Sequence, residues 1–305
     1  MIIKARNLRI VKILGGLGNQ MFQFALYKSL QQRFPEERVL VDLHCFRGYG
    51  KHRGFEVGKV FGAEYEAATW HEVARVAYPY PNYQLWRIGS RLLPVRKTML
   101  KERPDFTLEP TALTREGSTY YDGYWQHEEY FRDIRDVILQ TFRFPAFDDR
   151  NRETAQRLQA TNSIAIHVRR GDYTHDKLFH DICDLNYYRQ AISRMQQRVG
   201  GDLFCIFSDD LRWCREHIAP LLEGKLIVYV DWNRGADSVQ DIHLMSLCRH
   251  NIIANSSFSW WGAWLNQNPD KVVVAPDKWL HIKGTHSPVP ESWEEVRGEK
   301  LEVSG

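Results

Sequence analysis

The regular alternation of strand and helix patterns after Pro145 constrains the fold of this chain more than any other feature. Short apolar and β-branched runs typical of strands recur at Ile164–Val168, Leu203–Phe207, Leu226–Val230, Ile252–Ala254 and Val272–Ala275. Stretches with helical spacing lie between them, at Asn186–Val199, Val239–Cys248 and the segment WWGAWL at 260–265. Strands that alternate with helices form parallel βαβ units, so we expect an α/β fold.

The amino-terminal part begins in the same way. The pattern predicts a strand at Arg9–Leu14, a glycine-rich loop at Gly15–Gln20, a helix at Met21–Phe34, strands at Arg38–Leu43 and Tyr120–Gln126, and a helix at Glu128–Phe142. Residues 61–104 are interrupted by four prolines and give no assignment. Because a globular domain has about 100–200 residues, the 305 residues predict two domains, 1–150 and 151–305, with a boundary near 145–160.

Composition excludes several classes of protein. Lys and Arg number 41 against 38 Asp and Glu, and the net charge of +3 argues against bulk nucleic-acid binding. The five cysteines contain no Cys-x-x-Cys pair, so we expect no thiolate metal site and a reducing compartment. We find no apolar run of about 18 residues, no signal-peptide stretch and no amphipathic anchor, which predicts a soluble cytoplasmic protein.

The segment Ser163–Tyr173 (SIAIHVRRGDY) carries the strongest signal for a binding site. Alternate residues of a strand share a face, so we expect His167 and Arg169 on one side of the sheet and the Ile and Val side chains on the other. Arg170 and Asp172 follow at the carboxyl end of this strand, where open α/β sheets bind their ligands. Guanidinium groups suit a diphosphate, and the alternative is that both arginines form structural ion pairs.

Polar residues also follow two other predicted strands. Ser256, Ser257 and Ser259 stand before the tryptophan-rich helix, where hydroxyl and backbone N–H groups either bind an anion or cap the helix. Asp209 and Asp210 follow a strand in the same way, and an acid there either accepts hydrogen bonds from a nucleoside or caps the next helix. The tryptophans of the helix are expected to pack in the core.

The glycine loop resembles part of a dinucleotide-binding fingerprint. Gly16-x-Gly18 would need a third glycine where Met21 stands, and Asp42 ends the following strand as a ribose-binding acid would. The incomplete pattern leaves a nicotinamide-dependent oxidoreductase as an alternative function. Two adjacent glycines in the loop still indicate a close approach of the backbone to another group.

Five segments together resemble the bacterial alpha-1,2-fucosyltransferase family. They are GGLGNQMFQFALYKSL (15–30), HVRRGDY (167–173), FSDD (207–210), DIHLMSLCRH (241–250) and ANSSFSWWGAWL (254–265). The resemblance implies a GT-B-like α/β fold, with two facing Rossmann-like domains and a cleft between them. It also implies that the second domain holds GDP-fucose, that the first takes the acceptor, that the reaction inverts the anomeric carbon, and that no metal is required.

The same resemblance implies roles for individual residues. Arg169 would bind the β-phosphate and stabilise the departing GDP, supported by His167 and Arg170. The chemistry itself needs a base for the acceptor hydroxyl, or a loose transition state with late proton loss. Asp172 is our nominal base, and the alternative is that it orients the arginines. The other candidates for that base are His175, Asp176 and Asp181. The remaining donor-binding positions are Gly16, Gly18, Asn19, Asp209, Asp210, Asp241, Ser256, Ser257 and Phe258.

The implied reaction moves L-fucose from GDP-fucose to the 2-hydroxyl of a terminal galactoside in an oligosaccharide or O-antigen precursor. A lipid-linked acceptor would bring the protein to the inner face of the membrane, and the carboxyl-terminal tail is expected to pack back on the first domain. A non-catalytic nucleotide- or glycan-binding protein is the third reading. Neither the acceptor, for which residues 61–119 carry no matching motif, nor the oligomeric state follows from the sequence.

Overall fold

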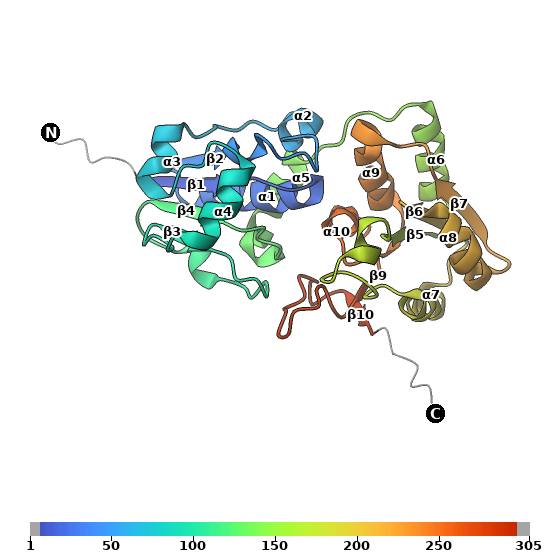
Figure 1. Ribbon diagram of the computed structural model, residues 1–305. Coiled ribbons are helices and arrows are strands. Elements are labelled where there is room, and N and C mark those ends of the chain that lie inside the picture. Colours follow the sequence, from blue (N-terminus) through green and yellow to red (C-terminus); the bar gives the residue numbers. More distant parts are fainter. Residues whose placement is uncertain (1–6, 298–305) are drawn as a thin grey trace, which may run out of the picture. The chain divides into compact units, whose positions relative to one another are not determined.

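Two parallel β-sheets, one in each half of the chain, organise the structure, which is a computed structural model describing residues 7–297 (Figure 1). The chain divides between Arg143 and Phe144 into two units, Met1–Arg143 and Phe144–Gly305. All strand pairs within the described residues are parallel, which confirms the predicted α/β class. Helix α6 (Asp149–Ala160) therefore lies wholly in the second unit.

The sheet of the first unit has the strand order β2-β1-β4-β3. Its strands are β1 (Leu8–Lys12), β2 (Arg38–Asp42), β3 (Met99–Lys101) and β4 (Thr119–Asp122). All residues of β1 are buried, because β1 pairs with strands on both sides and contacts helix α1 (Leu17–Arg33). The parallel strands end at one edge, so Lys12, Asp42 and Asp122 lie close together there.

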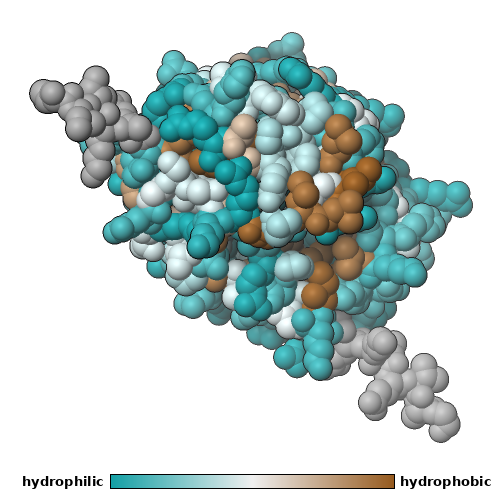
Figure 2. All heavy atoms as spheres, turned by 60° about the vertical axis from the view of Figure 1, so that its left-hand side comes forward, coloured by the Kyte–Doolittle hydropathy of each residue, from teal (hydrophilic) through white to brown (hydrophobic). Residues whose placement is uncertain are grey.

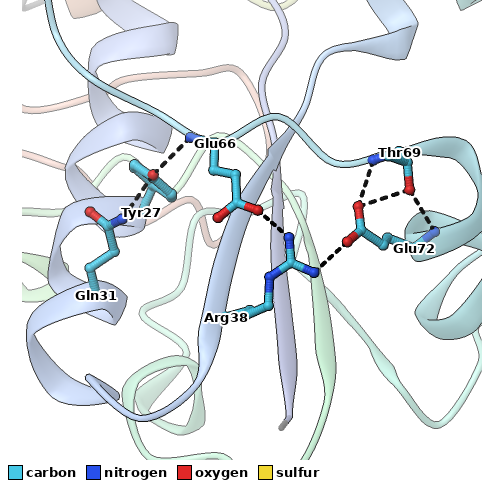
Figure 3. A network of polar contacts seen from close by, with 6 residues as sticks. All are labelled: Tyr27, Gln31, Arg38, Glu66, Thr69 and Glu72. Carbon is cyan, nitrogen blue, oxygen red and sulfur yellow. Dashed lines mark hydrogen bonds and ion pairs between the residues drawn. The ribbon is translucent and has the colours of Figure 1, made fainter. Parts of the chain in front are cut away.

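A network of ion pairs joins one helix of the first unit to β2 (Figure 3). Arg38, at the start of β2, pairs with Glu66 and with Glu72 of helix α3 (Trp70–Val76). Glu72 also forms a capping box with Thr69, so one carboxylate both begins the helix and joins it to the strand. The other α-helices described in this unit are α2 (Val57–Phe61), α4 (Tyr83–Leu92) and α5 (Arg135–Thr141).

The sheet of the second unit has the order β10-β9-β8-β5-β6-β7. Its strands are β5 (Ser163–Val168), β6 (Leu203–Ser208), β7 (Leu226–Val230), β8 (His250–Ile252), β9 (Val273–Pro276) and β10 (Glu294–Val296). Ile164, Ile166 and Val168 of β5 join one apolar cluster, whereas Ala165 joins another. The predicted alternation along this central strand is therefore confirmed.

Helices cover both faces of this sheet. They are α6, α7 (Leu185–Val199), α8 (Leu211–Trp213), α9 (Val239–Leu247) and α10 (Ser257–Trp264). Trp260, Trp261 and Trp264 of α10 are buried and contact one another through their rings. They pack in the core, as predicted, and offer no open surface on which a sugar could stack.

Some predicted elements need correction. The glycine loop is shorter than expected, because α1 begins at Leu17 and takes the loop's last residues into its first turn. The helix predicted at 128–142 is divided into 3₁₀ turns and α5, since Phe131 and Ile134 have non-helical backbone angles. Strands β3 and β10, of three residues each, were not predicted, and the strand predicted at Ile252–Ala254 spans His250–Ile252 instead.

The described end of the chain belongs to the second sheet, where β10 pairs with β9. The expected packing of the tail against the first domain involves residues 298–305, which lie outside the described residues. The five cysteines are buried free thiols. Within residues 7–297, no helix has both the length and the apolar character needed to cross a bilayer.

Candidate functional site

The carboxyl ends of β5, β6 and β8 bring most of the predicted site residues of the second unit together. β5 pairs with β6 and β8, so the residues that follow these three strands meet at one edge of the sheet. Arg169 and Arg170 follow β5, Asp209 and Asp210 follow β6, and Ser256 follows β8. Segments about forty to ninety residues apart therefore supply one cluster of charged and hydroxyl groups.

Arg169 lies between two carboxylates at this edge. Its terminal nitrogens are 2.7 Å from Asp172 Oδ1 and 3.0 Å from Asp209 Oδ2. The guanidinium also lies over the ring of Tyr173, with 5.4 Å between its carbon and the ring centroid. Because the Arg169 side chain remains 36% exposed, an incoming anion can reach it and exchange with these carboxylates.

Arg170 is less exposed than Arg169, at 28% of its side chain, and lies closer to an aromatic ring. Its Nε lies 3.4 Å from Asp210 Oδ2, and its guanidinium stacks 4.2 Å from the ring centroid of Trp213. The backbone N–H of Arg170 donates to Asp209 Oδ1 at 2.9 Å. The ion pairs that were the structural alternative are thus present, and they hold the two guanidinium groups in place at the sheet edge.

Gly171 permits the close approach of β5 and β6 at this point. A Cβ atom on Gly171 would lie 2.7 Å from Asp209 Oδ2, closer than such contacts occur. Any side chain at this position would therefore displace the carboxylate that bridges Arg169 and the backbone of Arg170. The glycine in the Arg-Arg-Gly-Asp segment has a steric reason that the sequence alone did not reveal.

His167 is buried beneath the arginines with 6% of its surface exposed. Burial and the neighbouring charge of Arg169 lower its pKa to about 3, so the imidazole is neutral at neutral pH. Its ring lies 5.9 Å from the ring of Phe258, and its Nδ1 finds no hydrogen-bond partner among the described residues. An unpartnered buried nitrogen beside a cationic group is a hydrogen-bonding position open to a ligand or a water molecule.

The edge residues line a cavity of about 220 Å³. Its lining includes Arg169, Arg170, Tyr173, Asp184, Trp213 and Asn255. Trp213 was not among the predicted site residues, and Tyr173 was quoted only as the end of a motif. No sequence signal distinguishes a tryptophan three residues after Asp210 from an ordinary core residue, because its role depends on where the arginine of another strand lies.

The serine segment after β8 acts mainly as a helix cap in this structure. Ser256 Oγ accepts a hydrogen bond from the backbone N–H of Phe258 at 3.4 Å and begins α10. The hydroxyl of Tyr173 also hydrogen-bonds Ser256, which ties the cap to the segment that follows β5. Ser257 is half-buried and occupies the first turn of α10. Of the two predicted uses of this segment, capping is observed, and ligand binding stays a prediction.

Asp241 lies on α9 and belongs to a polar network with the end of β7. Asn233 donates to Asp241 Oδ1 at 2.8 Å, and a second nitrogen-to-oxygen contact joins Asn233 to Asn151 of α6. Burial raises the pKa of Asp241 to about 7, although the hydrogen bond from Asn233 lowers it. The carboxyl group is therefore near its midpoint of ionisation at neutral pH.

In the first unit, the glycine loop is fixed by the side chains of α1. Gln20 donates to the carbonyl oxygens of Gly15 and Gly54 at 2.8 and 2.9 Å. Gly15 has φ of +102°, which favours glycine, and Gly16 is the N-cap of α1. Asn19 accepts a hydrogen bond from Gln126 at 2.8 Å and stays partly exposed on the first turn.

Asp42 does not have the surroundings of a ribose-binding acid. The carboxylate is 3% exposed and accepts hydrogen bonds from Tyr120 at 2.7 Å and from His44 at 2.6 Å. Burial alone would raise its pKa, but these hydrogen bonds hold the pKa below its usual value. Both oxygens are engaged within the fold, so the residue that suggested an oxidoreductase supports a structural role instead.

Comparison with known proteins agrees with this arrangement. The family model described as glycosyl transferase family 11 matches residues 97–286. The alpha-1,2-colitosyltransferase of Escherichia coli is 30% identical over 299 residues, which cover 95% of this chain and 99% of that protein. The O-antigen biosynthesis glycosyltransferase WbnK of Escherichia coli is 31% identical over 301 residues, which cover 92% of this chain and 97% of that protein.

Shorter or weaker similarities extend beyond these bacterial proteins. The galactoside alpha-(1,2)-fucosyltransferase 2 of Gorilla gorilla gorilla is 31% identical over 48% of this chain and 44% of its own length. Among solved structures, the fucosyltransferase NodZ from Bradyrhizobium aligns with a TM-score of 0.47 and 16% identity, covering 85% of this chain and 92% of that one.

Proposed function

This chain belongs to glycosyl transferase family 11, and from that premise we propose that it transfers L-fucose from GDP-fucose to the 2-hydroxyl of a terminal galactoside. One observation carries the proposal for the donor: Arg169 and Arg170 stand side by side at the carboxyl end of β5 and line an open cavity. The names of the bacterial and mammalian relatives support the α-1,2 linkage and the galactoside.

The proposed reaction breaks the bond between the fucose anomeric carbon and the β-phosphate oxygen. The electron pair of that bond moves to the phosphate, while the acceptor oxygen bonds to the opposite face of the carbon and inverts its configuration. Negative charge therefore grows on GDP in the transition state, and a fixed guanidinium group stabilises it there. We assign this role to Arg169, because it is the more accessible of the two arginines.

His167 and Arg170 act as positioning residues in this proposal. Neutral His167 supports the β5 end without adding charge, and Arg170 is oriented by Trp213 and Asp210. Asp172 remains our nominal base for the acceptor hydroxyl. Its side chain is 71% exposed and pairs with Arg169, so phosphate binding at Arg169 would free the carboxylate to accept the proton.

Asp241 is proposed to meet the guanosine part of the donor, as a carboxylate that accepts hydrogen bonds from guanine N–H groups. The ionised form accepts with both oxygens and a full charge, whereas protonation turns one oxygen into a donor. Because the pKa of Asp241 is about 7, GDP affinity is expected to rise roughly tenfold between pH 6 and pH 8. Asp241→Asn should keep the hydrogen bond from Asn233 and lose this pH dependence, as measured by calorimetric titration with GDP.

The unfolding behaviour of the ligand-free protein gives a second readout for Asp241. Its pKa is higher in the folded chain than in the unfolded one, so the folded state holds a proton that unfolding releases between about pH 4 and pH 7. Stability should therefore fall as pH rises through this window, and less so in Asp241→Asn. An Asp241→Asn variant with the GDP affinity and pH profile of the unaltered protein contradicts the assignment.

The acceptor is proposed to be an oligosaccharide or O-antigen precursor taken up by the first unit, where Asn19 and the glycine loop face solvent in part. The donor needs a separate test, since one relative is named a colitosyltransferase. Colitose is fucose without its 3-hydroxyl, and a site that hydrogen-bonds a hydroxyl discriminates strongly against an analogue lacking it. We propose fucose as the donor sugar and a cytoplasmic protein that meets lipid-linked acceptors at the membrane.

The experiment that tests this function is release of GDP from GDP-fucose in the presence of an acceptor panel. Terminal β-galactosides should support turnover, with the product linkage at the 2-hydroxyl, and EDTA should leave the rate unchanged because arginines supply the positive charge. Faster turnover with GDP-colitose would replace the proposed donor. Binding of GDP without turnover over the whole panel would favour a binding protein, and preferential binding of NADH would favour an oxidoreductase.

A further inference from the structure

The outer side of α4 carries an apolar stripe that no part of the described chain covers. Leu85, Ile88 and Leu92 are spaced i, i+3 and i+7 and therefore share one face of the helix, with 49%, 54% and 76% of their surface exposed. Leu93 and Val95 extend the exposure beyond the helix. Figure 2, which turns the side of the molecule bearing α4 forward, shows exposed apolar side chains gathered into a patch. Apolar clusters of this kind mark interaction surfaces.

The inner side of α4 is fixed to the first unit. The ring of Trp86 lies over Lys12 Nζ, with 3.9 Å between the nitrogen and the ring centroid. The rings of Tyr83 and Tyr49 lie 4.6 Å apart, and Gly89 leaves the space that Tyr80 occupies. The stripe is thus held outward by packing on the opposite side of the helix, and it cannot turn inward without breaking these contacts.

The charge around the stripe is positive. From residue 73 to residue 101 the chain has no Asp or Glu, whereas Arg87 and Arg91 on α4, and Lys97 after it, are exposed. Arg87 and Arg91 are spaced i and i+4, so they lie on one flank of the helix beside the apolar stripe. Exposed apolar side chains flanked by arginines, on a segment without acidic residues, complement a surface that is apolar within and anionic outside.

We propose that α4 is a membrane-docking helix, which lies in the interface of an anionic phospholipid bilayer with Leu85, Ile88 and Leu92 inserted. The exposed Arg87 and Arg91 beside the stripe complement the negative surface of such a bilayer, and residues 73–101 contain no acidic residue that the bilayer would repel. The docking is independent of the donor sugar. The role that we give to the docking rests on the proposed function. Because α4 covers Lys12 at the carboxyl edge of the first sheet, docking of α4 brings this edge close to lipid-linked acceptors.

From the sequence we expected no amphipathic anchor, and this proposal departs from that expectation. Apolar and aromatic residues occur on nearly every side of this helix, since Tyr83 and Trp86 face inward and Leu85 and Ile88 outward. In the sequence, the inward-facing and outward-facing residues alternate without a clear helical period, within a segment interrupted by prolines. The stripe becomes visible only when the side that packs against the sheet is known.

The test measures co-sedimentation of the full-length protein with vesicles of phosphatidylcholine alone and of phosphatidylcholine mixed with phosphatidylglycerol. The protein should bind the anionic vesicles, and salt should weaken this binding. The triple variant Leu85→Ser, Ile88→Ser and Leu92→Ser should bind roughly tenfold or more weakly. Arg87→Gln with Arg91→Gln should bind more weakly and lose much of the salt dependence.

The matched control for Leu92→Ser on α4 is Leu226→Ser on β7 of the second unit. The Leu226 side chain is also apolar and is 56% exposed. Leu226→Ser should bind vesicles as the unaltered protein does. GDP release with a soluble acceptor should be unchanged in every variant, which separates failure of docking from failure of the proposed function. Absence of vesicle binding, equal binding to neutral vesicles, or a dimer that the triple variant converts to a monomer would overturn the proposal.

Discussion

Replacement of Arg169 by alanine is expected to lower kcat/KM for fucosyl transfer by about 30- to 1000-fold, equivalent to roughly 2–4 kcal/mol of transition-state stabilisation. The loss follows from the charge that builds on GDP as the sugar leaves. Because that charge is larger in the transition state than in the bound donor, kcat should fall more than affinity for GDP. Steady-state kinetics and GDP titration of the same preparation separate the two effects.

Three controls make the result specific. Arg212→Ala removes a strongly exposed arginine of the same unit and should leave turnover unchanged. Arg169→Lys keeps the charge but loses the planar pair of donors, so its activity should lie between that of alanine and arginine. Thermal unfolding tests whether the loss of the ion pairs to Asp172 and Asp209 disturbs the fold. Near-normal turnover in a folded Arg169→Ala variant would end the proposed mechanism.

Asp122→Ala is expected to destabilise the protein by about 3–5 kcal/mol, the usual cost of leaving one partner of a buried ion pair uncompensated. Lys12 and Asp122 end adjacent parallel strands, and their side chains are only 5% and 7% exposed. Without the carboxylate, the buried Lys12 ammonium group would keep its contact with the Trp86 ring but lose its ion-pair partner. Denaturant unfolding of the two proteins at neutral pH measures the difference.

An exposed pair in the same unit provides the comparison. Asp133 pairs with Arg33 at side-chain exposures of 53% and 34%, and Asp133→Ala should cost at most about 1 kcal/mol because solvent screens the interaction. The double replacement Lys12→Met with Asp122→Leu should recover most of the stability, since it removes both charges together. Equal effects of Asp122→Ala and Asp133→Ala would show that burial of the pair contributes nothing.

The predicted site is a clear case of what a sequence can provide. The order of strands and helices places Arg169, Asp209 and Ser256 after the ends of three predicted strands, and parallel strands bring such ends to one edge. The local pattern alone therefore predicts most of the residues that form the cluster in the second unit. It could not decide between ligand binding and structural ion pairing, because that choice depends on distances and exposure.

Other features depended on contacts between distant segments. Trp213 stacks on Arg170, Asp209 accepts from the backbone next to Gly171, and Asp42 is closed off by Tyr120. Each of these contacts joins residues that are about forty to eighty positions apart in the sequence. The composition of one segment does not predict its contact with the other. The membrane-docking stripe of α4 belongs to the same group.

The sequence by itself determined the α/β class, the parallel direction of the strands in the second unit and the type of residue at the strand ends. These features follow from hydrophobic periodicity and from the alternation of strands with helices, which are local properties. Only the tertiary structure decided which carboxylates neutralise Arg169, which acid is enclosed and which face of α4 remains open. Burial and electrostatic pairing depend on the distances between segments that are far apart in the sequence. A local sequence pattern does not contain those distances.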